Sequence, residues 1–129
     1  MLDYIKYSPT SGLVKGTEQN PVPTNETTVV EITEKAFLDE GSQLAIYYDF
    51  TLGSLDSAIL RVYVDPGDGK YYQIPGIDED LTLLADAKEV YALPVYPMPG
   101  TNAKLKITIQ GTGTNTGSKL NLTVANRIN

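Results

Sequence analysis

Hydrophobic and polar residues alternate one by one through much of the chain. The alternation is clearest over residues 44–52, 58–65, 104–110 and 120–124. A period of two is typical of β-strands that bury one face and expose the other. It predicts one core, formed by Ile46, Tyr48, Phe50, Leu60, Val62, Ile107 and Leu122.

Turn signals separate these segments. Residues 65–69 read Asp-Pro-Gly-Asp-Gly, which favours a tight turn and predicts a hairpin between residues 58–65 and 70–75. The polar Gly/Thr/Asn stretch 111–118 predicts a second hairpin, between residues 104–110 and 120–124.

Three further segments complete the predicted fold. Residues 28–38 alternate as a strand. Residues 89–96 read as an edge strand, or as a strand that stops early, because Pro94 cannot donate a ladder hydrogen bond. Residues 78–88 suit a short helix with Asp78 as its N-cap. The chain is therefore predicted to be all-β, an antiparallel β-sandwich or jelly-roll-like barrel of about seven to eight strands.

The N-terminal region follows a different pattern. Residues 8–26 are rich in Pro, Gly, Ser, Thr and Asn and have hardly any apolar face. Long segments without regular structure are usually functional or disordered. We expect an irregular arm over residues 1–26 and a β-sandwich domain over residues 27–129. Residues 8–26 are expected to make few contacts within their own domain and to become ordered on a partner, and a disordered leader is the alternative.

Composition narrows the chemistry. The 129 residues include no His and no Cys, which excludes Ser-His-Asp and Cys-His nucleophiles, thiolates, disulfides and the usual zinc sites. No familiar catalytic motif is present. We expect neither enzymatic activity nor a cofactor.

The remaining candidate sites are better explained as turns. Asp65, Asp68 and the acidic run 78–80 offer oxygen ligands, but their spacing matches no known calcium loop, so no metal site is predicted. Residues 111–117 resemble a phosphate-binding loop only in their glycines, since the Gly-Lys-Ser/Thr ending is missing.

Charge divides the chain unevenly. The first hundred residues carry a net charge of −10, whereas the last 29 carry +4 from Lys104, Lys106, Lys119 and Arg127. If these residues share one hairpin, its outer side is a basic surface for an acidic partner. The alternative is a solvated strand face that complements acids of the same domain. Nucleic acid is not an expected partner because the whole chain is acidic, and neither is a membrane because no apolar run is long enough to span one.

Tyrosine is unusually common, with nine Tyr against two Phe. Two consecutive pairs, 47/48 and 71/72, must each turn one ring outward if they lie in strands. Exposed tyrosines suit contacts with proteins or sugars. The candidate partner-binding residues are Tyr47, Tyr71, Tyr91, Lys104 and Lys106, with packing between two sheets as the alternative for the tyrosines.

Residues 41–75 carry a family resemblance. A strand ending in Tyr-x-x-Thr-x-Gly at residues 48–53 is followed by a short Ser/Asp turn, a second strand, an Asp-Gly turn and the pair Tyr71-Tyr72. This order resembles small β-sandwich virion structural proteins of tailed bacteriophages, of the capsid decoration or head-completion type. No functional residue is carried over from it.

The resemblance implies a non-enzymatic and often oligomeric protein that binds a protein lattice. We therefore expect a virion protein, assembled in the host cytoplasm, that decorates or completes the capsid and has virion proteins as its partners. The alternative is a carbohydrate-binding or adhesion module, such as a tail or fibre component.

Overall fold

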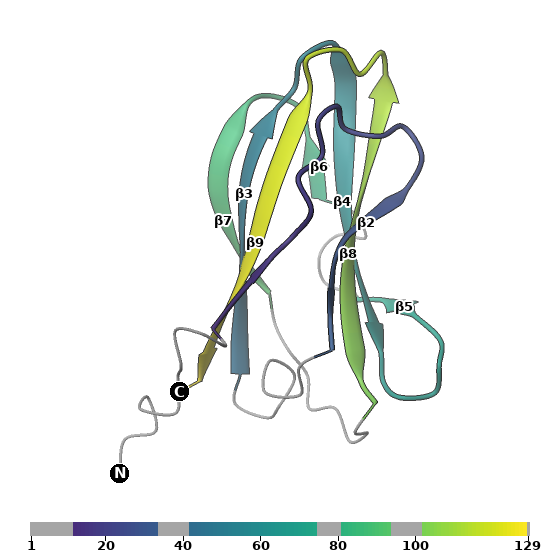
Figure 1. The fold of residues 1–129 in the computed structure, drawn as a ribbon, viewed down its shortest axis with the longest axis vertical. Helices are drawn as coiled ribbons and strands as arrows, with labels where there is room; N and C mark the ends of the chain where they lie inside the picture. The colour runs from purple at the N-terminus through teal and green to yellow at the C-terminus, as the bar shows by residue number, and fades with distance from the viewer. Residues whose placement is uncertain (1–11, 34–41, 75–80, 94–101, 129) are drawn as a thin grey trace.

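The computed structural model describes residues 12–33, 42–74, 81–93 and 102–128. Nine strands form in these residues, in two antiparallel sheets packed face to face (Figure 1). Their bounds are β1 (Leu13–Lys15), β2 (Thr27–Ile32), β3 (Ser42–Thr51), β4 (Leu55–Asp65), β5 (Tyr72–Gln73), β6 (Leu81–Leu83), β7 (Ala87–Leu93), β8 (Lys104–Gly113) and β9 (Lys119–Ile128).

The all-β prediction is confirmed, with nine strands in place of seven to eight. Sheet A has the order β1-β9-β3-β7, and sheet B has the order β2-β8-β4-β5, with β6 also paired to β4. Strands β5 and β6 lie one after the other along β4, beside Tyr63–Val64 and Ala58–Leu60 respectively. If β5 and β6 are counted as one strand position, the two sheets together have eight positions. The order of these positions is that of a jelly roll.

The predicted core is present. All seven residues named from the alternation are buried, and residues of both sheets join them in one hydrophobic cluster. Phe50 and Ile46 of sheet A and Leu60 and Ile107 of sheet B are at most 1% exposed. Burying a side chain of this size contributes about 1.5–3 kcal/mol, so this interior dominates the stability of the fold.

The predicted second hairpin is wrong. Strand β8 lies in sheet B between β2 and β4, whereas β9 lies in sheet A between β1 and β3. The segment between them therefore crosses from one sheet to the other. A polar loop between two alternating segments can close a hairpin within one sheet or cross to the other sheet. In both cases each strand buries its apolar face in the same interior, so the sequence pattern is the same. The first hairpin is confirmed, since β4 pairs with β5.

The predicted helix over residues 78–88 is also wrong within the described residues. Leu81–Leu83 is the strand β6, paired with β4, and β7 begins at Ala87. Pairing with β4 buries Leu83, which outweighs the weak local preference for a helix. The edge-strand prediction is confirmed for β7, which ends sheet A beside β3. Parts of three predictions lie outside the described residues: 94–96 of the predicted edge strand, 34–38 of the predicted strand 28–38, and 78–80 of the predicted helix.

Two turns that cross between the sheets are bonded to each other. The β3–β4 turn donates the Ser54 amide to the carbonyl of Thr116, in the β8–β9 connection, at 2.9 Å. Gly53 has a φ of 58° in this turn, and a Cβ there would lie 2.5 Å from both the Thr116 carbonyl oxygen and the Ser118 nitrogen. Only glycine allows both the positive φ and this approach.

The expectation that residues 8–26 make few contacts is wrong for residues 12–26. Strand β1 pairs with β9, Gly16 donates to Leu122 of sheet A, and Thr17 donates to Val29 of sheet B. Val22 is fully buried. Its amide donates to Ser118 Oγ at 2.9 Å, and its carbonyl accepts from Asn115 Nδ2 at 2.9 Å. The described part of the predicted arm is thus part of the sandwich, because groups of the β8–β9 connection and of both sheets satisfy its backbone while Val22 fills the interior.

We expect a charge in the core to prevent folding. Val62 is 3% exposed on β4 and faces the hydrophobic cluster. Val62→Asp buries a carboxylate without a partner, which costs several kcal/mol. Circular dichroism should show loss of the β-sheet signal for Val62→Asp, whereas Val62→Ala should keep it and melt at a lower temperature. A cooperatively melting Val62→Asp protein would contradict the assignment of this residue to the core.

The contact between Val22 and Ser118 supplies a second prediction. Ser118→Ala removes the acceptor of a buried amide and should lower the free energy of unfolding by about 1–3 kcal/mol, measured by urea denaturation. Ser54→Ala in the neighbouring exposed turn is the control and should stay within about 0.5 kcal/mol of the wild type. Equal effects of the two variants would show that residues 12–26 do not depend on this bond.

Candidate protein-binding surface

The outer side of sheet A is largely uncharged at one end. The register places Leu13, Ala125, Ala45 and Ala92 in one row across β1, β9, β3 and β7. The adjacent row holds Lys15, Thr123, Tyr47 and Val90, with Lys15 at the β1 edge of the sheet. We call Leu13, Ala45, Tyr47, Val90, Ala92 and Ala125 the apolar face.

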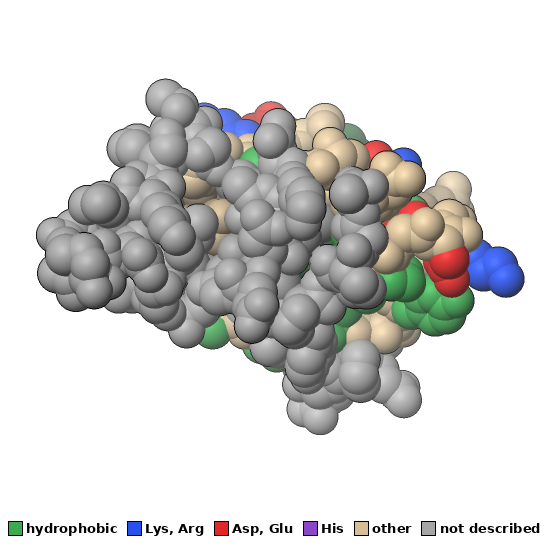
Figure 2. All heavy atoms as spheres, turned by 90° about the horizontal axis from the view of Figure 1, so that it is seen from below, with side chains coloured by type: hydrophobic (Ala, Val, Ile, Leu, Met, Phe, Trp, Pro, Cys, Tyr) green, Lys and Arg blue, Asp and Glu red, His purple; other side chains and the backbone are tan. Residues whose placement is uncertain are grey.

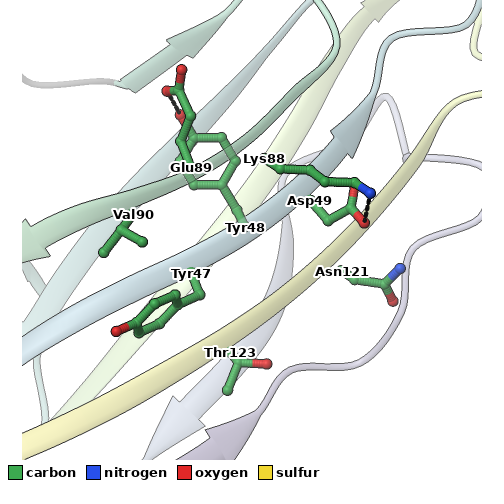
Figure 3. Close-up of a pocket in the computed structure, with 8 residues that line it drawn as sticks. All are labelled: Tyr47, Tyr48, Asp49, Lys88, Glu89, Val90, Asn121 and Thr123. Atoms are coloured by element: carbon green, nitrogen blue, oxygen red, sulfur yellow. Dashed lines mark hydrogen bonds and ion pairs between the residues drawn. The ribbon is translucent and has the colours of Figure 1, made fainter.

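The apolar face is exposed and has low relief. Leu13, Tyr47 and Val90 are 54%, 47% and 57% exposed, and alanines fill the space between them. Figure 3 shows Tyr47, Val90 and Thr123 on this side of the sheet, with Tyr48 turned toward Glu89. An open depression of about 350 Å³ lies beside Tyr47, which is too shallow to enclose a small molecule.

Charged residues mark one border of the apolar face. The following row holds Asn121, Asp49 and Lys88, and the Lys88 ammonium lies 4.0 Å from the Asp49 carboxylate (Figure 3). An apolar patch with a polar border is the usual composition of a protein-binding surface.

The outer side of sheet B has a different character, because its polar side chains bond to one another. The Glu26 carboxylate accepts hydrogen bonds from the hydroxyls of Tyr63 and Thr108, and Arg61 lies 3.7 Å away. The Tyr63 hydrogen bond is the main reason why the pKa of Glu26 is lowered, against the opposing effect of partial burial. The Tyr71 hydroxyl donates to Glu31, and burial together with this bond raises the pKa of Tyr71.

Lys106 lies within this network. Its ammonium is 4.3 Å from the ring centroid of Tyr71 and 5.1 Å from that of Tyr63, and Glu31 is its partner in the register with β2. Two cation–π contacts and neighbouring carboxylates balance its charge within the domain. For Lys106, the geometry favours the alternative of a strand face that complements acids of its own domain.

The five predicted partner-binding residues do not share one surface. Tyr47 belongs to the apolar face of sheet A, while Lys104, Lys106 and Tyr71 lie on the outer side of sheet B. Tyr91 is half buried and packs against the core. Lys119 lies on sheet A, 3.8 Å from Glu18, so the basic residues do not form the single surface that a β8–β9 hairpin would have produced.

Two other tyrosines have structural roles. The Tyr48 hydroxyl donates to Glu89 at 2.7 Å, and burial with this bond raises the pKa of Tyr48 to about 12. The Tyr72 hydroxyl donates to Asp68, in the turn between β4 and β5. Tyr48 is thus the inward and Tyr47 the outward member of their pair, as the alternation predicts.

The turn acids serve the turn itself. Asp65 accepts from the amides of Gly67 and Gly69, and Asp68 accepts from the amide of Lys70. Around this hairpin, side chains of both charges lie beside hydrophobic ones (Figure 2).

No group of acids suited to hold a metal ion occurs among the described residues, and residues 78–80 lie outside them. The described residues also contain no helix able to span a membrane.

Most of the apolar face was missed by reasoning from the sequence. Leu13 lies in the segment predicted to be an arm, and the three alanines carry no signal until the register aligns them. Alternation does place Val90 opposite in direction to Tyr91, so its exposure could have been predicted.

No protein-family model matches the chain, and no curated protein is detectably similar to it in sequence.

The position of Lys106 makes a prediction about stability. Lys106→Glu places a carboxylate between two tyrosine rings and opposite Glu31, and should lower the free energy of unfolding by about 1–2 kcal/mol. Lys15→Glu, at an exposed position on β1, is the control and should change it by at most about 0.5 kcal/mol. Urea denaturation of both variants measures the difference. Unchanged stability of Lys106→Glu would mean that the network is too solvated to matter.

Proposed function

We propose that this chain is a non-enzymatic structural protein that binds a protein lattice through the apolar face. The proposed setting is the virion of a tailed bacteriophage, assembled in the host cytoplasm, where the chain decorates or completes the capsid. The sequence resemblance over residues 41–75 supports this setting, and the apolar face supports the mode of binding.

The clustering of exposed hydrophobic side chains carries the proposal. The large hydrophobic residues most exposed in the described part of the chain are Leu13, Tyr47, Tyr72, Leu84 and Val90. Three of these five belong to the apolar face, although they come from three different strands. Single exposed hydrophobic residues need no explanation, but a contiguous group of them favours an interaction site.

The shape of the surface favours a protein over a sugar. Sugar and other small-ligand sites are concave and combine rings with converging polar groups. The apolar face instead presents one ring, Tyr47, beside a row of alanines. On sheet B, Tyr63 and Tyr71 have Lys106 against their rings, so those rings do not offer an open stacking platform. A jelly roll occurs in both capsid and lectin domains, so the fold alone does not choose between them.

Binding to particles tests the proposal with a matched pair of variants. Tyr47 and Tyr72 are 47% and 49% exposed, but they lie on different sheets. Particles of the encoding phage that lack this chain are mixed with the purified protein and sedimented. The wild type should bind, and Tyr47→Lys should bind at least tenfold more weakly, which corresponds to about 1.4 kcal/mol. Tyr72→Lys should bind like the wild type.

Three results would contradict the proposal. The wild type fails to bind the particles, or the two lysine variants lose binding equally, or the wild type binds a glycan array in a manner that Tyr47→Lys abolishes. The last result would favour the carbohydrate-binding alternative.

A further inference from the structure

The edges of the two sheets differ in how they are protected from pairing with another strand. An edge strand presents unpaired backbone N–H and C=O groups, and soluble proteins usually keep such edges short, bulged or charged. Strand β1 has three residues, β5 has two and β6 has three. Strand β2 is interrupted by a register shift between Thr28 and Val30 and carries Glu31.

Strand β7 lacks these devices over its second half. It has seven residues and pairs with β3 over seven consecutive positions without a register shift. Within the described residues its other side has no partner strand, and Figure 1 shows it at the outer margin of sheet A. Its charges, Lys88 and Glu89, lie in the first half, and residues 90–93 read Val-Tyr-Ala-Leu. Val90, at the middle of the strand, is 57% exposed.

We propose that β7 pairs with β7 of a second copy of this chain, antiparallel about a twofold axis at Val90. Such an axis, perpendicular to the sheet, keeps outward residues opposite outward residues. The eight strands of two copies of sheet A then form one continuous sheet. This interface goes beyond the proposed binding of a lattice and does not depend on it.

The residues of β7 favour an axis at Val90 over an axis one residue to either side. With the axis at Val90, Lys88 lies opposite Ala92 of the second copy, and Glu89 lies opposite Tyr91. Moving the axis by one residue toward the N-terminus places the two Glu89 carboxylates opposite each other, and like charges in that position are destabilising. Moving it by one residue toward the C-terminus places Pro94, which has no N–H to donate, opposite Lys88.

The register has a consequence for the apolar face. Val90 is one of its members, so pairing at Val90 brings the apolar faces of two copies side by side on one sheet. The Glu89 carboxylate already accepts the Tyr48 hydroxyl, which holds it toward the inner side of its own sheet and away from the outward Val90 contact. The dimer thus presents a doubled and twofold-symmetric apolar surface.

Sedimentation of the purified full chain tests the dimer without any particle. Over about 1 µM to 1 mM, the wild type should convert from monomer to dimer. Val90→Lys sets two ammonium groups opposite each other at the axis and should raise the dissociation constant at least tenfold. It should leave the melting temperature of the monomer nearly unchanged, because the side chain is exposed. Leu13→Lys is the matched control, since Leu13 is 54% exposed on the same face but at the opposite edge, and it should dimerise like the wild type.

Cysteine cross-linking tests the register directly, because the wild-type chain has no Cys. Opposite residues of an antiparallel pair bring their Cβ atoms to about 4.5–5.5 Å, close to the range of a disulfide. Val90→Cys should form a covalent dimer with a mild oxidant such as diamide, and Leu13→Cys should form far less.

A wild type that stays monomeric throughout this concentration range would overturn the proposal. An equal increase of the dimer dissociation constant in Val90→Lys and Leu13→Lys would also overturn it. That result would indicate that two apolar faces pack against each other. Failure of Val90→Cys to cross-link in a dimeric protein would reject the register. None of these measurements involves phage particles, so they succeed or fail independently of the proposed function.

Discussion

Burial of one face of each sheet against the other is the interaction on which the rest of this molecule depends. Apolar side chains at alternate positions of β3, β9, β4 and β8 meet in a single interior. Because successive long strands belong to different sheets, the chain must cross the edge of this interior repeatedly. The crossing turns are therefore tightly constrained, as the approach of Gly53 to Thr116 and Ser118 illustrates. The segment before β2 is held for the same reason, since Val22 completes the interior between the two sheets.

The two outer sides of the sandwich satisfy their side chains differently. On sheet B, the carboxylates accept hydrogen bonds from tyrosine hydroxyls, and Lys106 lies against the tyrosine rings. A partner would have to displace these contacts, so it would gain little free energy by binding there. On sheet A, the apolar face has no such compensation and stays in contact with water. A partner that covers it gains the free energy of apolar burial without breaking internal hydrogen bonds. This contrast, rather than net charge, distinguishes the two sides as candidate interfaces.

Local sequence patterns predicted the individual strands well and their connections poorly. Alternation identified the buried members of β3, β4, β8 and β9, and Pro94 correctly marked β7 as an edge. It did not show that β8 and β9 lie in different sheets, because a hairpin and a crossing between sheets use similar polar loops and bury the same faces. The N-terminal segment was misjudged for a related reason. Its backbone is satisfied by Asn115, Ser118 and Leu122, which lie about a hundred residues further along the chain.

The sequence by itself determined the all-β class, the seven core residues named from the alternation and the direction in which Tyr47 and Tyr48 point. Each of these follows from the two-residue period of a strand, which is a local property of the backbone. Only the tertiary structure decided which side chains share a surface. Leu13, Ala45, Val90 and Ala125 become neighbours through the register of four strands, and the basic residues of the C-terminal region separate because β8 and β9 join different sheets. Strand order and register arise from the packing of the whole interior, so no short stretch of the chain contains them.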